Sequence, residues 1–169
     1  VISETANMFE VAFDLFRNRH MPVIVKPVSG GSSFATKVVR TYDELRSALV
    51  EASQHGDVLV EDFIPGKEAT VCVIEGTTPG ESFVLYPIEI VPPPAHDFFD
   101  QDVKYSGEPE EICPGRFTLE VHGKLRELAL KAHHAIGARH YSRSDFIIAD
   151  DGIYLLEINT LPGLTDNSL

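Results

Sequence analysis

The stretch that decides the fold reads Ser142-Arg143-Ser144-Asp145-Phe146-Ile147-Ile148-Ala149-Asp150-Asp151-Gly152-Ile153-Tyr154-Leu155-Leu156-Glu157-Ile158-Asn159. Its two apolar, β-branched arms flank Asp150-Asp151-Gly152, which has the composition of a three-residue hairpin loop with glycine in the left-handed position. A loop of that length makes Ala149 and Ile153 the pair that flanks it. The sequence therefore predicts an antiparallel hairpin whose register is fixed by its turn.

Four polar side chains of this hairpin fall on one face in that register. Counting back from the loop pairs Asp145 with Glu157 and Arg143 with Asn159, and directly opposed Cβ atoms lie about 5 Å apart. Because two opposed carboxylates repel each other, a positive group must lie between them, either Arg143 or a hard divalent cation. Two carboxylates and an amide oxygen suit Mg²⁺ or Mn²⁺ and do not suit zinc.

A purely structural interpretation of the hairpin stays open at this point. Arginine–carboxylate pairs on sheets are common and need no ligand. Magnesium, by contrast, usually keeps few protein ligands and completes its shell with water and substrate phosphates. The choice depends on whether the remaining chain supplies a phosphate-binding loop and a lysine.

A lysine and a glycine-rich loop stand near the beginning of the chain. Residues 23–27 read as a buried strand with Lys26 at its end, where an ammonium group is costly unless it meets an anion. The loop 28–35 is rich in Gly and Ser and can expose backbone N–H groups that bind phosphate. It is neither a Walker loop nor a Rossmann fingerprint, and a simple turn is the alternative.

Composition limits the classes of function. The chain has 169 residues, 43% hydrophobic and 24% charged, which suits one domain or two small lobes. The net charge of -12 argues against non-specific binding to nucleic acid or to anionic membranes. Cys72 and Cys113 share no metal-binding spacing and are too few for a disulfide framework, so we expect a reduced, cytoplasmic protein. No signal peptide and no apolar run of about 18 residues appears.

Helical and strand patterns alternate as in an α+β protein with antiparallel sheets. We expect an N-terminal helix and linker (1–22), a small lobe (23–91) and a large C-terminal lobe (92–169), with a lid loop at 92–115. A disordered insertion is the alternative for that loop. The chain opens without an initiator Met and stops in a Gly-, Asn- and Ser-rich loop, so we expect a piece of a longer protein, truncated at its end.

Six short motifs occur in a fixed order along nearly the whole chain: Val25-Lys26-Pro27, Gly31-Ser32-Ser33, Val60-Glu61-Asp62-Phe63-Ile64, Val103-Lys104-Tyr105, Arg143-Ser144-Asp145 and Glu157-Ile158-Asn159-Thr160-Leu161-Pro162-Gly163. Each motif alone is weak, but together they are specific. In this order they resemble the ATP-grasp superfamily, and most closely the D-alanine:D-alanine ligases, without the N-terminal domain of that family.

The resemblance implies that two α+β lobes clamp ATP between them. Lys26 and Lys104 hold its phosphates, and the loop with Gly31, Ser32 and Ser33 closes over them. The strand end formed by Glu61, Asp62, Phe63 and Ile64 meets the adenine, and Glu68 holds the ribose hydroxyls. Two Mg²⁺ or Mn²⁺ ions are then bound by Asp145, Glu157 and Asn159.

The resemblance also implies the reaction. One D-alanine carboxylate attacks the γ-phosphate to give an acyl phosphate, and the amine of a second D-alanine displaces phosphate. Arg143 and the backbone N–H of Gly163 form the oxyanion site, and Ser168 with Leu169 holds the second substrate. Ser32 and Tyr105 orient substrate together with a glutamate of the missing domain.

Three hypotheses about function follow. The first is a D-alanine:D-alanine ligase fragment for peptidoglycan synthesis, with small-molecule substrates and with the full-length protein a homodimer. The second is a ligase with another acceptor, such as D-lactate, D-serine or another amine. The third is a nucleotide-binding module without catalysis. For the isolated fragment we expect weak Mg-ATP binding and poor turnover.

Overall fold

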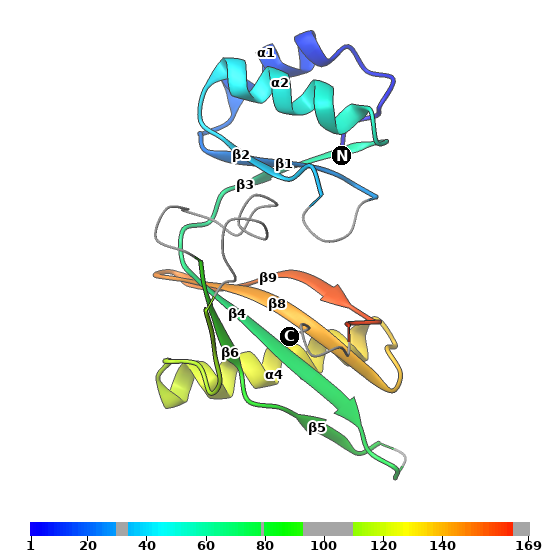
Figure 1. Cartoon of the computed structure of the whole chain (residues 1–169), viewed down its shortest axis with the longest axis vertical. Coiled ribbons are helices and arrows are strands. Elements are labelled where there is room, and N and C mark those ends of the chain that lie inside the picture. Colours follow the sequence, from blue (N-terminus) through cyan, green and yellow to red (C-terminus); the bar gives the residue numbers. More distant parts are fainter. Residues whose placement is uncertain (30–33, 79, 93–109, 164–169) are drawn as a thin grey trace. The chain divides into compact units, whose positions relative to one another are not determined.

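The computed structural model describes residues 1–29, 34–78, 80–92 and 110–163. The described residues form two compact units, one from residues 1–63 with Pro92 and the other from residues 64–91 and 110–163. Among them, no helix is long and apolar enough to cross a membrane. The α+β class with antiparallel sheets is confirmed (Figure 1).

The first unit is a three-stranded antiparallel sheet with two helices. Its elements are α1 (Met8–Asn18), β1 (Val23–Pro27), β2 (Lys37–Val39), α2 (Tyr42–Ser53) and β3 (Val58–Asp62). The strand order is β2-β1-β3, and both helices cover the same face of the sheet. The helices bury alternate residues of β1, including Val23 and Val25, which leaves the side chains between them on the other face.

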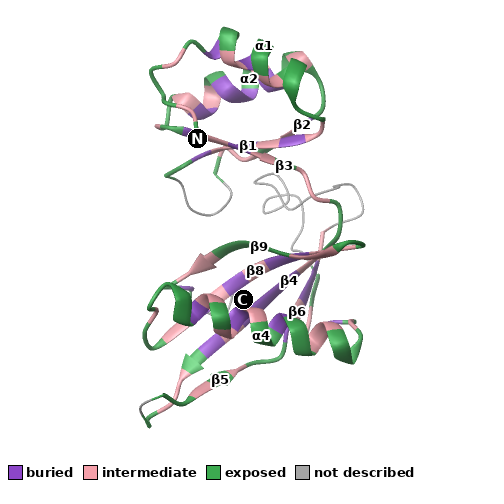
Figure 2. Cartoon of the chain, turned by 180° about the vertical axis from the view of Figure 1, so that it is seen from behind, coloured by how far each residue is buried: buried purple, intermediate pink, exposed green. Residues whose placement is uncertain are grey.

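The second unit is a larger antiparallel sheet with one helix. Its elements are β4 (Lys67–Glu75), β5 (Ser82–Val84), β6 (Ile88–Val91), β7 (Glu110–Ile112), α4 (Leu119–Ala135), β8 (Tyr141–Ala149) and β9 (Gly152–Asn159). The strand order is β7-β6-β4-β8-β9, and β5 pairs with β4. Leu125 and Ala129 of α4 pack against Phe146 of β8 and alternate residues of β4. Buried residues concentrate on β4 and β8, whereas no residue of β9 is buried (Figure 2).

The boundary between the units differs from the predicted small lobe at 23–91. β4 pairs with β8 along eight residues, from Lys67 with Ile148 to Ile74 with Tyr141, so residues 64–91 belong to the second unit. The pairing joins strands that are distant in the sequence, and strand patterns alone do not identify such partners. Part of the predicted lid loop at 92–115 is a strand, because Glu110–Ile112 forms β7 against β6. Residues 93–109 lie outside the described residues.

The β8–β9 hairpin has the predicted pairing of Asp145 with Glu157, but its turn is shorter than predicted. Ala149 pairs with Gly152 around a two-residue turn, and Gly152 does not have a positive φ, so the predicted three-residue loop is wrong. A register shift between Asp145 and Phe146 then moves the pairing by one residue on β9, from Phe146 with Leu155 to Asp145 with Glu157. Asp145 faces Glu157, as the sequence predicts. A β-bulge adds one residue to one strand, and here it compensates for the shorter turn.

Candidate functional site

Two rows of polar side chains cross β4, β8 and β9 on the face of the sheet opposite α4. The first row is Thr70, Asp145 and Glu157; the second is Cys72, Arg143 and Asn159. Directly paired residues of an antiparallel ladder point to the same face. The residues between them on β8, among them Ser144 and Phe146, are buried on the α4 side. The alternation of the strands therefore gathers the polar residues on one surface.

The Asp145 carboxylate is bound by two neighbours. Arg143 donates from Nε to Oδ1 at 3.0 Å and from Nη2 to Oδ2 at 2.9 Å, and Thr70 donates from Oγ1 to Oδ1 at 2.5 Å. The Arg143 and Asp145 side chains are only 17% and 13% exposed. Although burial opposes the charge of the guanidinium, its bonds to Asp145 raise the pKa of Arg143. Paired, partly buried groups of this kind hold a fixed geometry.

Two further carboxylates on this face are not neutralised in the same way. The pKa of Glu68 is raised to about 7, first by burial and then by the negative charges of Asp145 and Glu157, while Arg143 opposes the shift. Glu157 is exposed and forms no ion pair with any described residue. One guanidinium thus faces three carboxylates, an excess of negative charge that favours a bound cation.

The oxygen donors at this surface fit a hard divalent ion. Asp145 and Glu157 supply carboxylate oxygens, and Asn159 supplies an amide oxygen that also accepts from the backbone N–H of Leu161 at 3.0 Å. Within the described part of the chain, no three His, Cys, Asp or Glu side chains gather into a metal cluster. Magnesium needs only one or two carboxylates and completes its shell with water and phosphate oxygens. The donors suit such an ion and would not form a closed zinc site.

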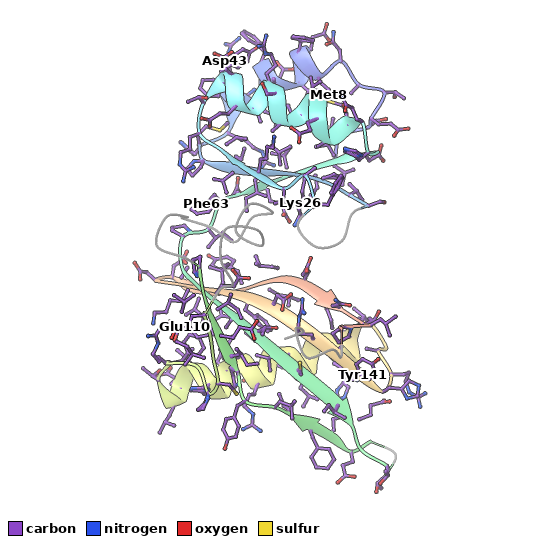
Figure 3. All side chains as sticks on the ribbon, in the orientation of Figure 1. Met8, Lys26, Asp43, Phe63, Glu110 and Tyr141 are labelled. Carbon is purple, nitrogen blue, oxygen red and sulfur yellow. The ribbon has the colours of Figure 1, made fainter. Side chains whose placement is uncertain are left out.

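The first unit holds the other residues that the sequence singles out. Lys26 lies at the end of β1 (Figure 3), and its Nζ atom is 2.6 Å from Oε2 of Glu61 on β3. Asp62 accepts from Arg19 at 3.0 Å. Lys26 lies on the face of the sheet that the helices leave uncovered, because Val25 and Pro27 on either side are buried. The predicted strand end is therefore present, and its glutamate neutralises the lysine.

The structure describes only some of the predicted site residues. It brings together Glu68, Arg143, Asp145, Glu157 and Asn159 within the second unit, and Lys26 with Glu61 within the first. Phe63 and Ile64 lie at the junction of the two units, and Gly163 is exposed after β9. The predicted residues outside the described part of the chain are Gly31, Ser32, Ser33, Lys104, Tyr105, Ser168 and Leu169.

Thr70 is the residue of this surface that the sequence did not reveal. It stands in a strand pattern that contains several buried apolar residues, and nothing local distinguishes its hydroxyl from any strand threonine. Its role becomes visible only when β4 is placed beside β8. The available signal is its spacing of two residues from Glu68, which puts both side chains on one face.

Comparison with known proteins agrees with this geometry. The family model described as "D-ala D-ala ligase C-terminus" matches residues 3–169. The D-alanine–D-alanine ligase of Francisella philomiragia is 38% identical over 149 residues, which cover 88% of this chain and 48% of that protein. The enzyme of the same name from Geotalea uraniireducens is 41% identical over 152 residues, with 88% and 46% covered.

Solved structures show the same likeness in three dimensions. D-alanyl-alanine synthetase A from Vibrio cholerae superposes with a TM-score of 0.79 at 29% identity, covering 99% of this chain and 51% of that one. The VanG D-Ala:D-Ser ligase from Enterococcus faecalis gives 0.78 at 30% identity, covering 95% and 46%. The chain spans about half the length of the relatives it matches. It has the ATP-grasp fold and belongs to the D-alanine–D-alanine ligase family, in the C-terminal part of that family's sequence.

Proposed function

We propose that this chain is the ATP- and metal-binding part of a ligase that joins two D-alanines for peptidoglycan precursors, with release of ADP and phosphate. The observation that carries most weight is the opposed pair of Asp145 and Glu157 with the Arg143 guanidinium fixed beside them. A structural ion pair needs one carboxylate, and this surface holds two more, Glu68 and Glu157, that lack a bonded cation among the described residues. Such an excess of negative charge on one face of a sheet usually has a use.

The proposed metal site consists of Asp145, Glu157 and Asn159. These residues hold two Mg²⁺ or Mn²⁺ ions, which neutralise charge on the β- and γ-phosphates of ATP. Arg143, whose Nε and Nη2 atoms donate to Asp145, presents a guanidinium of fixed orientation. With the N–H of Gly163 it forms the oxyanion site, where a preorganised donor stabilises developing negative charge.

The remaining predicted residues bind the nucleotide and the substrates. Lys26, released from Glu61, and Lys104 hold the phosphates, and the loop of Gly31, Ser32 and Ser33 covers them. The β3 end from Glu61 through Asp62, Phe63 and Ile64 meets the adenine. Glu68, whose pKa is near neutrality, holds the ribose hydroxyls. Ser32 and Tyr105 orient the first substrate, and Ser168 and Leu169 hold the second.

The identity of the acceptor has one competing candidate. The VanG structure is described as a D-Ala:D-Ser ligase and is as similar to this chain as the D-alanine ligase structure. D-Serine is therefore the acceptor to compare with D-alanine. We further propose a homodimer for the complete protein and a cytoplasmic location, where ATP is available and two free cysteines stay reduced.

The test is acceptor-dependent release of ADP by the complete gene product. We expect release to require D-alanine and a divalent metal, and to fall by at least about 100-fold in Arg143→Met, since loss of one oxyanion donor costs about that much. Exposed Arg126 on α4, replaced in the same way, serves as the matched control. ADP release that requires D-serine and not D-alanine would identify D-serine as the acceptor. ADP release that requires neither amino acid would exclude the ligase reaction.

A further inference from the structure

We propose that Thr70 is a positioning residue that fixes the Asp145 carboxylate so that its Oδ2 atom is the one left to bind a metal ion. This inference rests on the metal binding proposed above. It concerns a residue of β4, whereas the proposed metal ligands belong to β8 and β9. The observations behind it are the burial of Thr70, its bond to Asp145 and the remaining acceptor positions of that carboxylate.

Thr70 is held where its hydroxyl can reach only one strong acceptor. It is 2% exposed and pairs directly with Asp145 across the β4–β8 ladder. Its Oγ1 lies 2.5 Å from Oδ1 of Asp145 and 3.5 Å from the backbone oxygen of Ser144. A hydroxyl has one proton, and a bond of 3.5 Å is too long to compete. Thr70 therefore donates its hydroxyl hydrogen bond to the Asp145 carboxylate.

The acceptor positions of Asp145 are unequally occupied. A carboxylate offers roughly two acceptor positions on each oxygen. Oδ1 accepts from both Thr70 and Nε of Arg143, so it is filled. Among the described residues, Oδ2 accepts only from Nη2 of Arg143, which leaves one acceptor position on that oxygen. Thr70 thus leaves Oδ2 as the oxygen with a free position for a metal ion. It also fixes the carboxylate in the orientation in which Arg143 donates to both of its oxygens.

Loss of the hydroxyl removes this distinction between the two oxygens. Without Thr70 donating, Oδ1 regains an open position, and the carboxylate is held by Arg143 alone on a face where Glu68 and Glu157 repel it. Threonine is stiff at χ1 because it is β-branched, so its hydroxyl is aimed with little entropic cost. Partners that orient metal ligands in this way typically contribute 10- to 100-fold, in order of magnitude, to metal affinity.

The test measures metal-nucleotide affinity, a property that a merely structural threonine would not control. Calorimetric titration uses Mn²⁺ with a non-hydrolysable ATP analogue against the chain and against Thr70→Val and Thr70→Ser. We expect Thr70→Val, which keeps the shape and loses the donor, to weaken binding about 10-fold or more. Thr70→Ser keeps the donor and should stay within about threefold of the wild type.

The matched control is Ser144→Ala on the neighbouring strand. Ser144 is fully buried and faces the α4 side, where it pairs with Val71. Its hydroxyl has no hydrogen-bond partner within the described part of the chain, so its loss should leave affinity unchanged. Circular dichroism and thermal melting establish that each variant is folded, and Thr70→Ala replaces the valine variant if that one does not fold.

Each outcome has a separate meaning. Equal affinities of the wild type and folded Thr70→Val overturn the role of Thr70 and leave the metal site standing. A 10-fold loss in folded Thr70→Ser also overturns it, because the donor is still present. Failure of the wild type to bind the Mn²⁺ complex contradicts the proposed metal site itself, and with it this inference.

Discussion

Replacement of Glu68 by Gln is expected to remove a pH dependence of stability that runs opposite to that of most carboxylates. In the folded chain the pKa of Glu68 is about 7, against an ordinary value of 4.5, because the side chain is largely buried and faces Asp145 and Glu157. Below pH 4.5, the Glu68 carboxyl is protonated in both the folded and the unfolded state. As pH rises, the unfolded chain loses it first, so stability falls until the folded pKa is passed.

The size of the effect follows from the separation of the two pKa values. Each unit of pKa corresponds to 1.36 kcal/mol, so the full difference is about 3 kcal/mol, reached above pH 7 or so. The assay is urea unfolding in metal-free buffer at a series of pH values, with backbone hydrogen exchange on β4 to locate the effect. The free energy of unfolding of the wild type should fall relative to Glu68→Gln across that window.

The control is the same replacement of glutamate by glutamine at an exposed position. Glu111 on β7 is exposed in the same unit, and Glu111→Gln should follow the wild-type pH curve. Parallel curves for the wild type and Glu68→Gln would refute the reasoning, since they would mean that the Glu68 carboxyl titrates alike in both states. A wild type that gains stability with rising pH, relative to Glu68→Gln, would reverse the sign and refute it as well.

Three further substitutions test the second unit. Phe146→Ala empties a fully buried position between β8 and α4 and should cost about 3–5 kcal/mol in urea unfolding; a cost below about 1 kcal/mol would show that this core is loosely packed. Hydrogen bonds from Arg116, and to a lesser extent from Lys67, lower the pKa of Glu89 to about 2. Glu89→Gln removes this carboxylate. The wild type should therefore lose stability relative to this variant as pH falls from about 4.5 to about 2, whereas identical acid unfolding curves would contradict the ion cluster. Gly66→Ala places a Cβ 2.5 Å from the backbone oxygen of Ile148 and should lower the melting temperature, since backbone atoms cannot yield cheaply; an unchanged melting temperature would contradict that close approach.

Local features of the fold could be predicted from the sequence. A capping box of Thr41 and Glu44 begins α2, and its Thr-x-x-Glu pattern can be read from the sequence because all its atoms lie within one turn of chain. The pairing of Asp145 with Glu157 was also confirmed. That success depended on a bulge that offsets a turn shorter than expected, and neither the bulge nor the turn length is specified by composition alone.

Features that depend on distant segments could not be predicted in the same way. Residues 64–91 were assigned to the small lobe but belong to the second unit. β4 pairs with β8, which lies about 75 residues away in the sequence, and β5 and β6 then pair with β4. Thr70 was missed for the same reason, since its partner is Asp145. The pKa of Glu68 likewise results from burial and from charges on β8 and β9, so no property of its own strand indicates it.

The central claim is that the face shared by β4, β8 and β9 binds ATP through a divalent metal. The most direct measurement is calorimetric titration of Mg-ATP into the chain, with Asp145→Asn beside Asp150→Asn, an exposed carboxylate in the turn of the same hairpin. We predict magnesium-dependent binding that Asp145→Asn abolishes and Asp150→Asn leaves unchanged. Binding that persists in a folded Asp145→Asn variant, or that does not require magnesium, would contradict the account.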